Sequence, residues 1–299
     1  MLDRATKIES SATMLATQVS NTTLPAVRLQ SGQEQEALAF LAERPIHTVI
    51  MAGFIRDNGL VGPLNRGDFY GYRDAQDRLK GVALIGHATL IEARVDAALA
   101  AFARVAQESP AAHMMMGEQE EIKQFWKYYA ENSRRPGLMC RELLFEQRWP
   151  VEVCAPVEGL RLATKDDLKL VIPAHARMAF EETRINPLAT DPMGFRMRCE
   201  RRVERGRTWV WVDNDRLIFK ADIVAETPEA AYLEGIYVNP EERCKGYGVR
   251  CISQLTRTLL ERTTSVCLLV NEQNRRAQAM YKKAGYRLRA CYDSIFSQR

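Results

Sequence analysis

One stretch decides the fold of this chain: Leu233-Glu-Gly-Ile-Tyr-Val-Asn-Pro-Glu-Glu-Arg-Cys-Lys-Gly-Tyr-Gly-Val249. An apolar strand leads into a turn, and the turn ends in Arg243-x-x-Gly246-x-Gly248 where a helix begins. Glycines let the backbone curl so that successive N–H groups converge at the helix start, where the helix dipole also favours negative charge. The stretch therefore predicts a backbone site for phosphate or pyrophosphate. It is neither a Walker A loop nor the dinucleotide fingerprint.

A second pattern follows downstream. Residues 265–270 are typical of a buried strand, and residues 271–274 of a turn that caps the next helix. That helix is expected over 275–284, and Gly285 stands where a left-handed residue ends it.

Together the two patterns resemble the GNAT N-acetyltransferase superfamily. The first matches its pyrophosphate loop after a Val-x-Pro strand end, and the second reads Val270-Asn-x-x-Asn274-x-x-Ala277-x-x-x-Tyr281-x-Lys283-x-Gly285-Tyr286. The resemblance implies acetyl-CoA as co-substrate, with the loop around its pyrophosphate and strand backbone along its pantetheine arm. The implied cofactor-binding residues are Ile236, Tyr237, Val238, Arg243, Cys244, Lys245, Gly246, Tyr247, Gly248, Val249 and Asn274.

Two residues are the catalytic candidates. The resemblance places Tyr281 beside the sulfur of CoA, where a phenol held within hydrogen-bond reach can protonate the leaving thiolate. The alternative is that Tyr281 only packs its helix against the sheet. Glu234 is the candidate base, acting directly or through water, and strand alternation predicts that it shares a face with Ile236 and Val238. On a central strand, that position predicts a buried carboxylate.

The acceptor is expected between the helix over 166–180 and the N-terminal domain. Glu181 and Glu182 at the end of this helix are candidates for holding a cationic amine. The alternative is a solvated pair of charges at a helix end.

The chain of 299 residues suits two domains. We expect an arm over 1–27, an α/β domain over 28–155 and an acetyltransferase domain over 156–299. The C-terminal half has the element order β-α-α-β-β-β-α-β-α-β and predicts a mixed α/β sheet. The N-terminal half repeats much of that order, with strands at 68–74, 81–85, 89–92 and 113–116 and helices at 95–107 and 118–129. It has no glycine-rich loop between Glu92 and Val95, so it is interpreted as a degenerate copy that does not bind CoA; an unrelated α/β cap domain is the alternative.

The composition of the chain limits the classes of partner and cofactor that can be expected. The net charge of +4 is too small and too dispersed for a nucleic-acid surface. No apolar run is long enough to cross a bilayer, and the first residues lack a signal-peptide core, which favours the cytoplasm. The seven cysteines are scattered without histidine partners, so neither a disulfide framework nor a metal site is expected.

These observations favour an enzyme that transfers an acetyl group from acetyl-CoA to a primary amine in a direct ternary complex. The acceptor is a small molecule or a protein amine, and the sequence leaves its identity and the oligomeric state open. Two alternatives remain: a non-catalytic CoA-binding sensor, and an acyltransferase that uses a longer acyl-CoA. Thiol release measured together with CoA binding would separate them.

Overall fold

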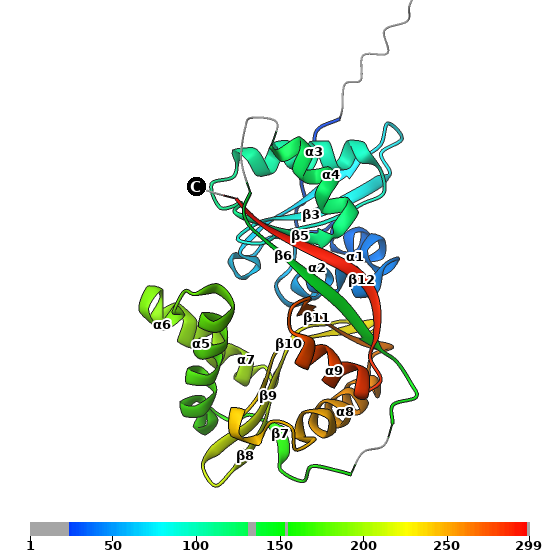
Figure 1. Ribbon diagram of the computed structural model, residues 1–299. Coiled ribbons are helices and arrows are strands. Elements are labelled where there is room, and N and C mark those ends of the chain that lie inside the picture. The colour runs from blue at the N-terminus through cyan, green and yellow to red at the C-terminus, as the bar shows by residue number, and fades with distance from the viewer. Residues whose placement is uncertain (1–23, 131–135, 153–154, 298–299) are drawn as a thin grey trace, which may run out of the picture.

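A single mixed sheet runs through the whole molecule. The computed structural model describes residues 24–130, 136–152 and 155–297. Within them, twelve strands pair in the order β1-β2-β3-β4-β5-β12-β6-β11-β10-β9-β8-β7. In Figure 1 the N-terminal half lies above and most of the C-terminal half below, and the long strands β6 and β12 cross from one to the other.

The N-terminal half opens with two helices and continues as an antiparallel meander. Its apolar residues recur at the periods that strands and helices require, and buried side chains of α3 and α4 pack together on one face of the sheet. Its elements are β1 (Val27–Arg28), α1 (Glu34–Ala42), α2 (Pro45–Asn58), the short helix η1 (Pro63–Asn65), β2 (Gly67–Arg73), β3 (Leu79–Gly86), β4 (Thr89–Ala93), α3 (Asp96–Glu108), β5 (Met114–Glu118), α4 (Gln119–Tyr129) and β6 (Pro136–Gln147).

The C-terminal half begins with a short strand and a helical layer. The side chains of Thr164 and Asp167 form a capping box that starts this layer. Its elements are β7 (Leu160–Leu162), η2 (Lys165–Asp167), α5 (Leu168–Thr183), α6 (Pro187–Thr190), α7 (Pro192–Glu204), β8 (Thr208–Asp213), β9 (Arg216–Glu226), β10 (Ala230–Val238), η3 (Pro240–Glu242), α8 (Tyr247–Leu260), β11 (Ser265–Asn271), α9 (Arg275–Lys283) and β12 (Arg287–Ser297).

The two halves exchange strands at the centre of the sheet. Strand β6 follows the N-terminal helix α4, yet it pairs with β11 of the C-terminal half. Strand β12 follows the C-terminal helix α9, yet it pairs with β5 of the N-terminal half. The two exchanged strands also pair with each other from Pro136/Ser297 to Glu146/Arg287. Each half therefore completes the sheet of the other.

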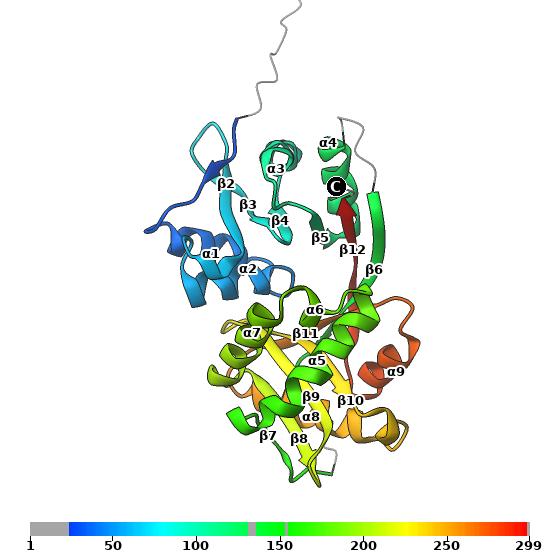
Figure 2. The ribbon, with the colours of Figure 1, turned by 90° about the vertical axis from the view of Figure 1, so that its left-hand side faces the viewer.

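Helix α2 adds a second connection between the halves. It belongs to the N-terminal half but packs against strand β9, where a Cβ on Gly53 would lie 2.5 Å from the Cβ of Ala225. Near its end, Asp57 accepts hydrogen bonds from the guanidinium of Arg207, one of them 2.7 Å long. Figure 2 shows α1 and α2 above the C-terminal strands, with α5 and α7 beside β9 and β10.

Most elements expected from the sequence are present. The predicted strands and helices of residues 68–129 and 160–292 agree with the structure to within a few residues, and the predicted mixed α/β fold is confirmed. Helices α1 and α2 and strand β6 were not predicted. Of the expected arm, residues 1–23 lie outside the described residues, and Val27–Arg28 pairs with β2.

Candidate functional site

Strands β10 and β11 separate in the middle of the sheet. Their parallel pairing runs from Ala230/Ser265 to Leu233/Leu268. Beyond it, β10 continues to Val238 and β11 to Asn271, and no further pair joins them in the described part of the chain. The backbone edge of β10 that faces β11 is thus free to pair with an extended ligand.

A bulge at Gly235 bends β10 away from its neighbour. Gly235 has φ 60°, and the register with β9 shifts between Glu234 and Tyr237. The buried ammonium of Lys220 donates a hydrogen bond to the carbonyl oxygen of Gly235 at 3.1 Å. A Cβ on residue 235 would lie 2.9 Å from both Lys220 Nζ and Asp222 Oδ2, so this position requires glycine.

The bulge reverses the expected alternation of side chains. Leu233, Ile236 and Val238 all pack into the core beneath α8 and α9, whereas Tyr237 packs on the opposite face with α5. Glu234 follows Leu233 directly and lies on the face of α5, where it is exposed. The prediction that Glu234 is buried beside Ile236 and Val238 is therefore wrong, because the extra residue at the bulge shifts the period by one.

The glycine-rich loop adopts the expected form between β10 and α8. Cys244 and Gly246 have left-handed φ values of 65° and 81°. Helix α8 has no side-chain cap, and its first backbone bond runs from Arg250 N to Gly246 O at 3.2 Å. A Cβ on Gly246 would meet nothing within 4 Å. The N–H groups of this first turn lack partners inside the helix and are open to an anion.

Other residues of the loop hold it in place. A Cβ on Gly248 would lie 2.5 Å from Met280 Sδ, so this glycine lets α8 approach α9. Arg243 Nε donates to Val238 O at 3.2 Å, and Lys245 pairs with Glu242 at 2.8 Å. Both cationic side chains, like that of Cys244, are exposed. Tyr247 and Val249 are half-buried in the first turn of α8.

Helix α9 brings the two residues of the second pattern to this opening. Asn274 Oδ1 accepts from Ala277 N at 3.1 Å and thereby caps the helix. The Tyr281 side chain is 5% exposed, with its ring 6.3 Å from that of Phe145 and 5.9 Å from that of Tyr286. Among the described residues, the Tyr281 hydroxyl has no hydrogen-bond partner. Burial, and to a lesser extent the charge of Glu182, raises the pKa of this phenol.

Three carboxylates gather near the separating strands: Glu182 at the end of α5, Glu234 on β10 and Glu142 on β6. The Glu182 side chain reaches solvent, but the protein around it removes enough water to raise its pKa to about 7, aided by the charges of Glu234 and Glu142. Burial, with Glu234 as a further cause, raises the pKa of Glu142. Ser294 Oγ donates to Glu142 at 2.7 Å. Among the residues that the structure describes, none of these three carboxylates forms an ion pair. We name them the carboxylate cluster.

The sequence-predicted carboxylates behave differently from one another. Glu181 pairs with Arg177 at 2.9 Å on the exposed side of α5. Its neighbour Glu182 forms no ion pair within the described chain, and the charge of Glu234 helps burial to raise its pKa. Glu142 was not singled out from the sequence, because only the exchange of β6 into the C-terminal sheet brings it here.

The N-terminal half has a hollow of ≈ 580 Å³ at the corresponding place, where β4 and β5 part after Leu90/Met116. Only Arg94 and Val95 connect β4 to α3, which leaves no room for an anion loop. Asp96 occupies the first turn of α3, and Glu118, Glu120 and Glu121 line the opposite wall. The hollow is also lined by arginines, each in an ion pair with a carboxylate: Arg44 with Glu92 and Glu118, Arg94 with Glu92 and Glu43, and Arg289 with Glu146.

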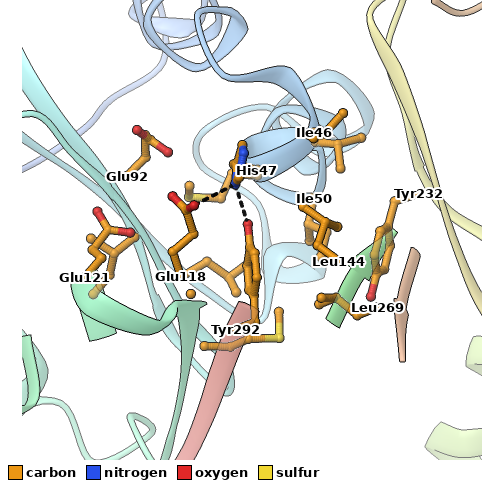
Figure 3. A pocket seen from close by; sticks show the side chains of 16 residues that line it. Ile46, His47, Ile50, Glu92, Glu118, Glu121, Leu144, Tyr232, Leu269 and Tyr292 are labelled. Atoms are coloured by element: carbon orange, nitrogen blue, oxygen red, sulfur yellow. Dashed lines mark hydrogen bonds and ion pairs between the residues drawn. The ribbon is translucent and has the colours of Figure 1, made fainter. Parts of the chain in front are cut away.

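A small cavity lies between α2 and the central strands. Figure 3 shows His47 directed toward both Tyr292 and Glu118, with Leu144, Leu269 and Tyr232 beside them. His47 Nδ1 lies 2.9 Å from the Tyr292 hydroxyl and 3.6 Å from Glu118 Oε1. The cavity holds ≈ 30 Å³, enough for water but not for an acceptor molecule. We assign it to the contact between the halves.

A family model described as "FR47-like protein" matches residues 220–294, which include both sequence patterns. A GNAT-family acetyltransferase from Colwellia psychrerythraea covers 92% of this chain and 100% of its own, at 11% identity and a TM-score of 0.55. The chain has the GNAT fold.

Two further structures extend this fold to both halves of the chain. A GCN5-related N-acetyltransferase from Sphaerobacter thermophilus covers 93% of this chain and 96% of its own, with 13% identity and a TM-score of 0.59. A tandem GNAT protein from the clavulanic acid biosynthesis pathway covers 92% and 97%, with 12% identity and a TM-score of 0.56. Among curated proteins nothing matches. In the described part of the chain, every helix is too short or too polar to cross a membrane.

Proposed function

We propose that this GNAT-fold protein transfers an acetyl group from acetyl-CoA to a primary amine in a ternary complex. One observation carries the proposal: β10 and β11 part between Tyr281, which packs in the core beneath α8 and α9, and Glu234 on the face of α5. The donor can then reach the opening from the side of α8 and α9. The acceptor amine can reach it from the side of α5.

The residues around the opening fit CoA. The open first turn of α8, with Arg243 and Lys245 near it, would hold the pyrophosphate. The free edge of β10 at Ile236 and Val238 would pair with the amide groups of the pantetheine arm. Asn274, at the start of α9, would contact the same arm. Acetyl-CoA supplies an activated thioester, so the protein has mainly to orient the reactants and move protons.

The proton movements follow from the environments of the side chains. A new N–C bond forms at the thioester carbon while the C–S bond breaks, and the amine loses a proton. We propose Glu234 as the acceptor of that proton, directly or through water. Glu182 is a second carboxylate suited to the task, since a base is most effective near the working pH. Tyr281, like any phenol, is protonated at neutral pH, and burial raises its pKa further. We propose that it donates this proton to the departing thiolate.

We further propose that the division at 155/156 separates the two halves, and that only the C-terminal half binds CoA. The hollow of the N-terminal half supports this, since its carboxylates would repel a pyrophosphate. We propose the cytoplasm as the compartment, and as acceptor a small molecule or a protein amine rather than a nucleic acid.

Free thiol released from acetyl-CoA in the presence of a panel of amines tests the proposal. We expect thiol release that depends on the amine, together with an equal amount of the amide product. Calorimetry with CoA is run in parallel, because CoA binding without turnover of any amine would favour the sensor. A higher rate of thiol release from a longer acyl-CoA would identify that acyl-CoA as the donor, and the proposed mechanism would stay the same.

A further inference from the structure

A fully buried ammonium group lies beneath the bulge of β10. It belongs to Lys220 on β9, and burying such a charge is unfavourable unless each of its N–H groups finds a partner. The ammonium donates to the Asp222 carboxylate and to the carbonyl oxygen of Gly235 at 3.1 Å, and it lies 3.3 Å from His175 Nδ1. An ammonium has three N–H donors, so these partners fix its orientation.

The carboxylate of Asp222 has a second cation besides Lys220. Arg202 on α7 donates to it at 2.7 Å, and Thr208 Oγ1 donates to its other oxygen at 2.8 Å. Burial opposes the ionisation of Asp222, but the charges of Lys220 and Arg202 lower its pKa. Two buried cations thus meet one carboxylate. Neutralising Asp222 therefore does not by itself account for Lys220, and its other charged contact is with the carbonyl of Gly235.

This contact turns the peptide between Gly235 and Ile236 out of the sheet. Carbonyl groups that pair with a neighbouring strand lie in the sheet, whereas this one is bonded to an ammonium on the face of α5, beside His175. In the described pairing, neither Gly235 nor Ile236 has a Cα partner on β9 or β11. The peptide is trans, so the N–H of Ile236 points away from Lys220 and from the face of α5.

A cation bonded to the carbonyl of a peptide strengthens the N–H group of the same peptide as a donor. A hydrogen bond from a charged group is stronger than a neutral one, and hydrogen bonds linked in a chain polarise each other. In the proposed reaction the amine adds to the thioester carbon, and the electron pair of the C=O bond moves onto the oxygen. When the C–S bond breaks, that pair returns and the sulfur leaves with the bonding pair. A donor aimed at this oxygen therefore stabilises the transition state.

We propose that Lys220 is a positioning residue for acetyl transfer: acting through the peptide between Gly235 and Ile236, its charge orients and strengthens an N–H donor for the thioester oxygen. The inference rests on the proposed acetyl transfer and adds a residue that touches neither reactant. The N–H of Ile236 meets a donor that enters from the side of α8 and α9, while the ammonium stays buried on the opposite face of β10.

Difference infrared spectroscopy of the full-length protein tests this inference. Acetyl-CoA, isotope-labelled at the acetyl carbonyl carbon, is compared with unlabelled acetyl-CoA, so that only the thioester carbonyl band appears. A carbonyl that accepts a stronger hydrogen bond absorbs at a lower frequency. We expect the bound thioester to absorb below free acetyl-CoA, and Lys220→Met to move the band most of the way back. The measurement requires neither an amine nor turnover.

A variant at the same carboxylate separates the peptide from the ion pair. Arg202→Met removes the other cation from Asp222 but leaves the contact with Gly235, so the carbonyl band should stay at the parent frequency. Lys220→Met keeps Asp222 paired with Arg202, and thermal unfolding establishes that it is folded. Lys220→Gln, with an uncharged amide, should also move the band back, and it decides the question if Lys220→Met does not fold.

Kinetics and calorimetry provide a second readout. With an amine that the parent turns over, Lys220→Met should lower kcat by about 10-fold or more, since the polarised donor acts mainly in the transition state. The affinity for CoA, which lacks the carbonyl, should stay the same. A purely structural role would weaken CoA as well, because the edge of β10 proposed to pair with the pantetheine arm would move.

The outcomes separate this inference from the proposed function. A thioester band that is not shifted in the parent, a shift that survives in Lys220→Met, or a loss of CoA affinity in that variant would overturn the inference and leave acetyl transfer intact. A shifted band without turnover of any amine would support the polarised N–H and count against acetyl transfer. No binding of acetyl-CoA to the parent would end both.

Discussion

Tyr281 combines two properties that a structural residue seldom has together. Its ring packs between Phe145 and Tyr286, yet its hydroxyl bonds no described residue. Tyr286, by contrast, has its hydroxyl 2.6 Å from Thr256 Oγ1. The Tyr281 hydroxyl therefore keeps its hydrogen-bonding capacity for a bound reactant, whereas that of Tyr286 is used within the core.

We expect Tyr281→Phe to lower kcat by about 100-fold and to leave the affinity for acetyl-CoA nearly unchanged, because a proton donor acts mainly in the transition state. Steady-state kinetics with an amine substrate, together with CoA calorimetry, measure both. The ring is kept, so the unfolding temperature should hardly move. If the variant turns over the amine at the parent rate across the pH range, Tyr281 has only a packing role.

Glu182 should set the acid limb of the pH–rate profile. Its pKa is raised to about 7, so the carboxylate is protonated below that pH and ionised above it. Only the ionised form can hold an ammonium or accept its proton; kcat/KM for the amine should therefore rise through pH 7. The causes of the raised pKa are burial first, and then the charges of Glu234 on β10, Glu142 on β6 and Glu181 on its own helix.

The comparison of parent with Glu182→Gln isolates this titration from that of the amine, which affects both proteins alike. We expect the ratio of their kcat/KM values to grow by about 10-fold from pH 6 to pH 8. The corresponding ratio for Glu181→Gln should stay constant, because Glu181 is held by Arg177 on the surface. A constant ratio for Glu182→Gln would assign the acid limb to another group, with Glu234 the first to examine.

At the scale of elements, the two glycines of the loop have different tasks. Gly248 is buried where α8 approaches Met280, so a larger residue there would separate two helices. Gly246 is exposed, has φ 81°, and leaves open space in front of the helix start. Substitution of Gly246 therefore tests the anion site, and substitution of Gly248 tests the packing.

Gly246→Val should abolish CoA binding, since it places a branched side chain where the pyrophosphate would approach and strains a left-handed position. Calorimetry with CoA measures the loss. Gly32→Val is a matched control: its φ is 97° with nothing within 4 Å, but it lies in a turn before α1. Both variants should lose a similar stability of about 1–3 kcal/mol, and only the first should lose CoA. Unchanged CoA affinity in Gly246→Val would refute the assignment of this loop.

At the scale of the whole molecule, two similar halves have unequal loops. In the C-terminal half, eight residues from Asn239 to Gly246 separate β10 from α8, whereas Arg94 and Val95 alone separate β4 from α3. We expect a titration to give one CoA per chain. The same titration of Gly246→Val should then show no site. A stoichiometry near two would mean that the N-terminal hollow also binds the cofactor.

The exchange of β6 and β12 should make the two halves unfold together. Each half loses a strand at the middle of its sheet when the other unfolds, and α2 packs on β9 as well. We expect a single cooperative transition in urea, with fluorescence and circular dichroism coinciding. Two separate transitions would show that the halves are stable without the exchanged strands.

The sequence alone determined the elements and the loop, because those depend on neighbours along the chain. Residues 233–249 predict a strand, an anion loop and a helix from glycine positions and apolar periodicity, and the structure has them in this order. The strands over 208–213 and 265–270 were equally readable, since buried strands show continuous apolar runs.

Only the tertiary structure decided which residues make up the carboxylate cluster. One extra residue at Gly235 moves Glu234 to the face of α5, and no local pattern distinguishes a bulge from a regular strand containing glycine. Glu142 joins Glu182 and Glu234 because β6 pairs with β11, more than a hundred residues away along the chain. Pairing of strands so distant depends on the closure of the whole sheet, for which neither strand carries a signal of its own.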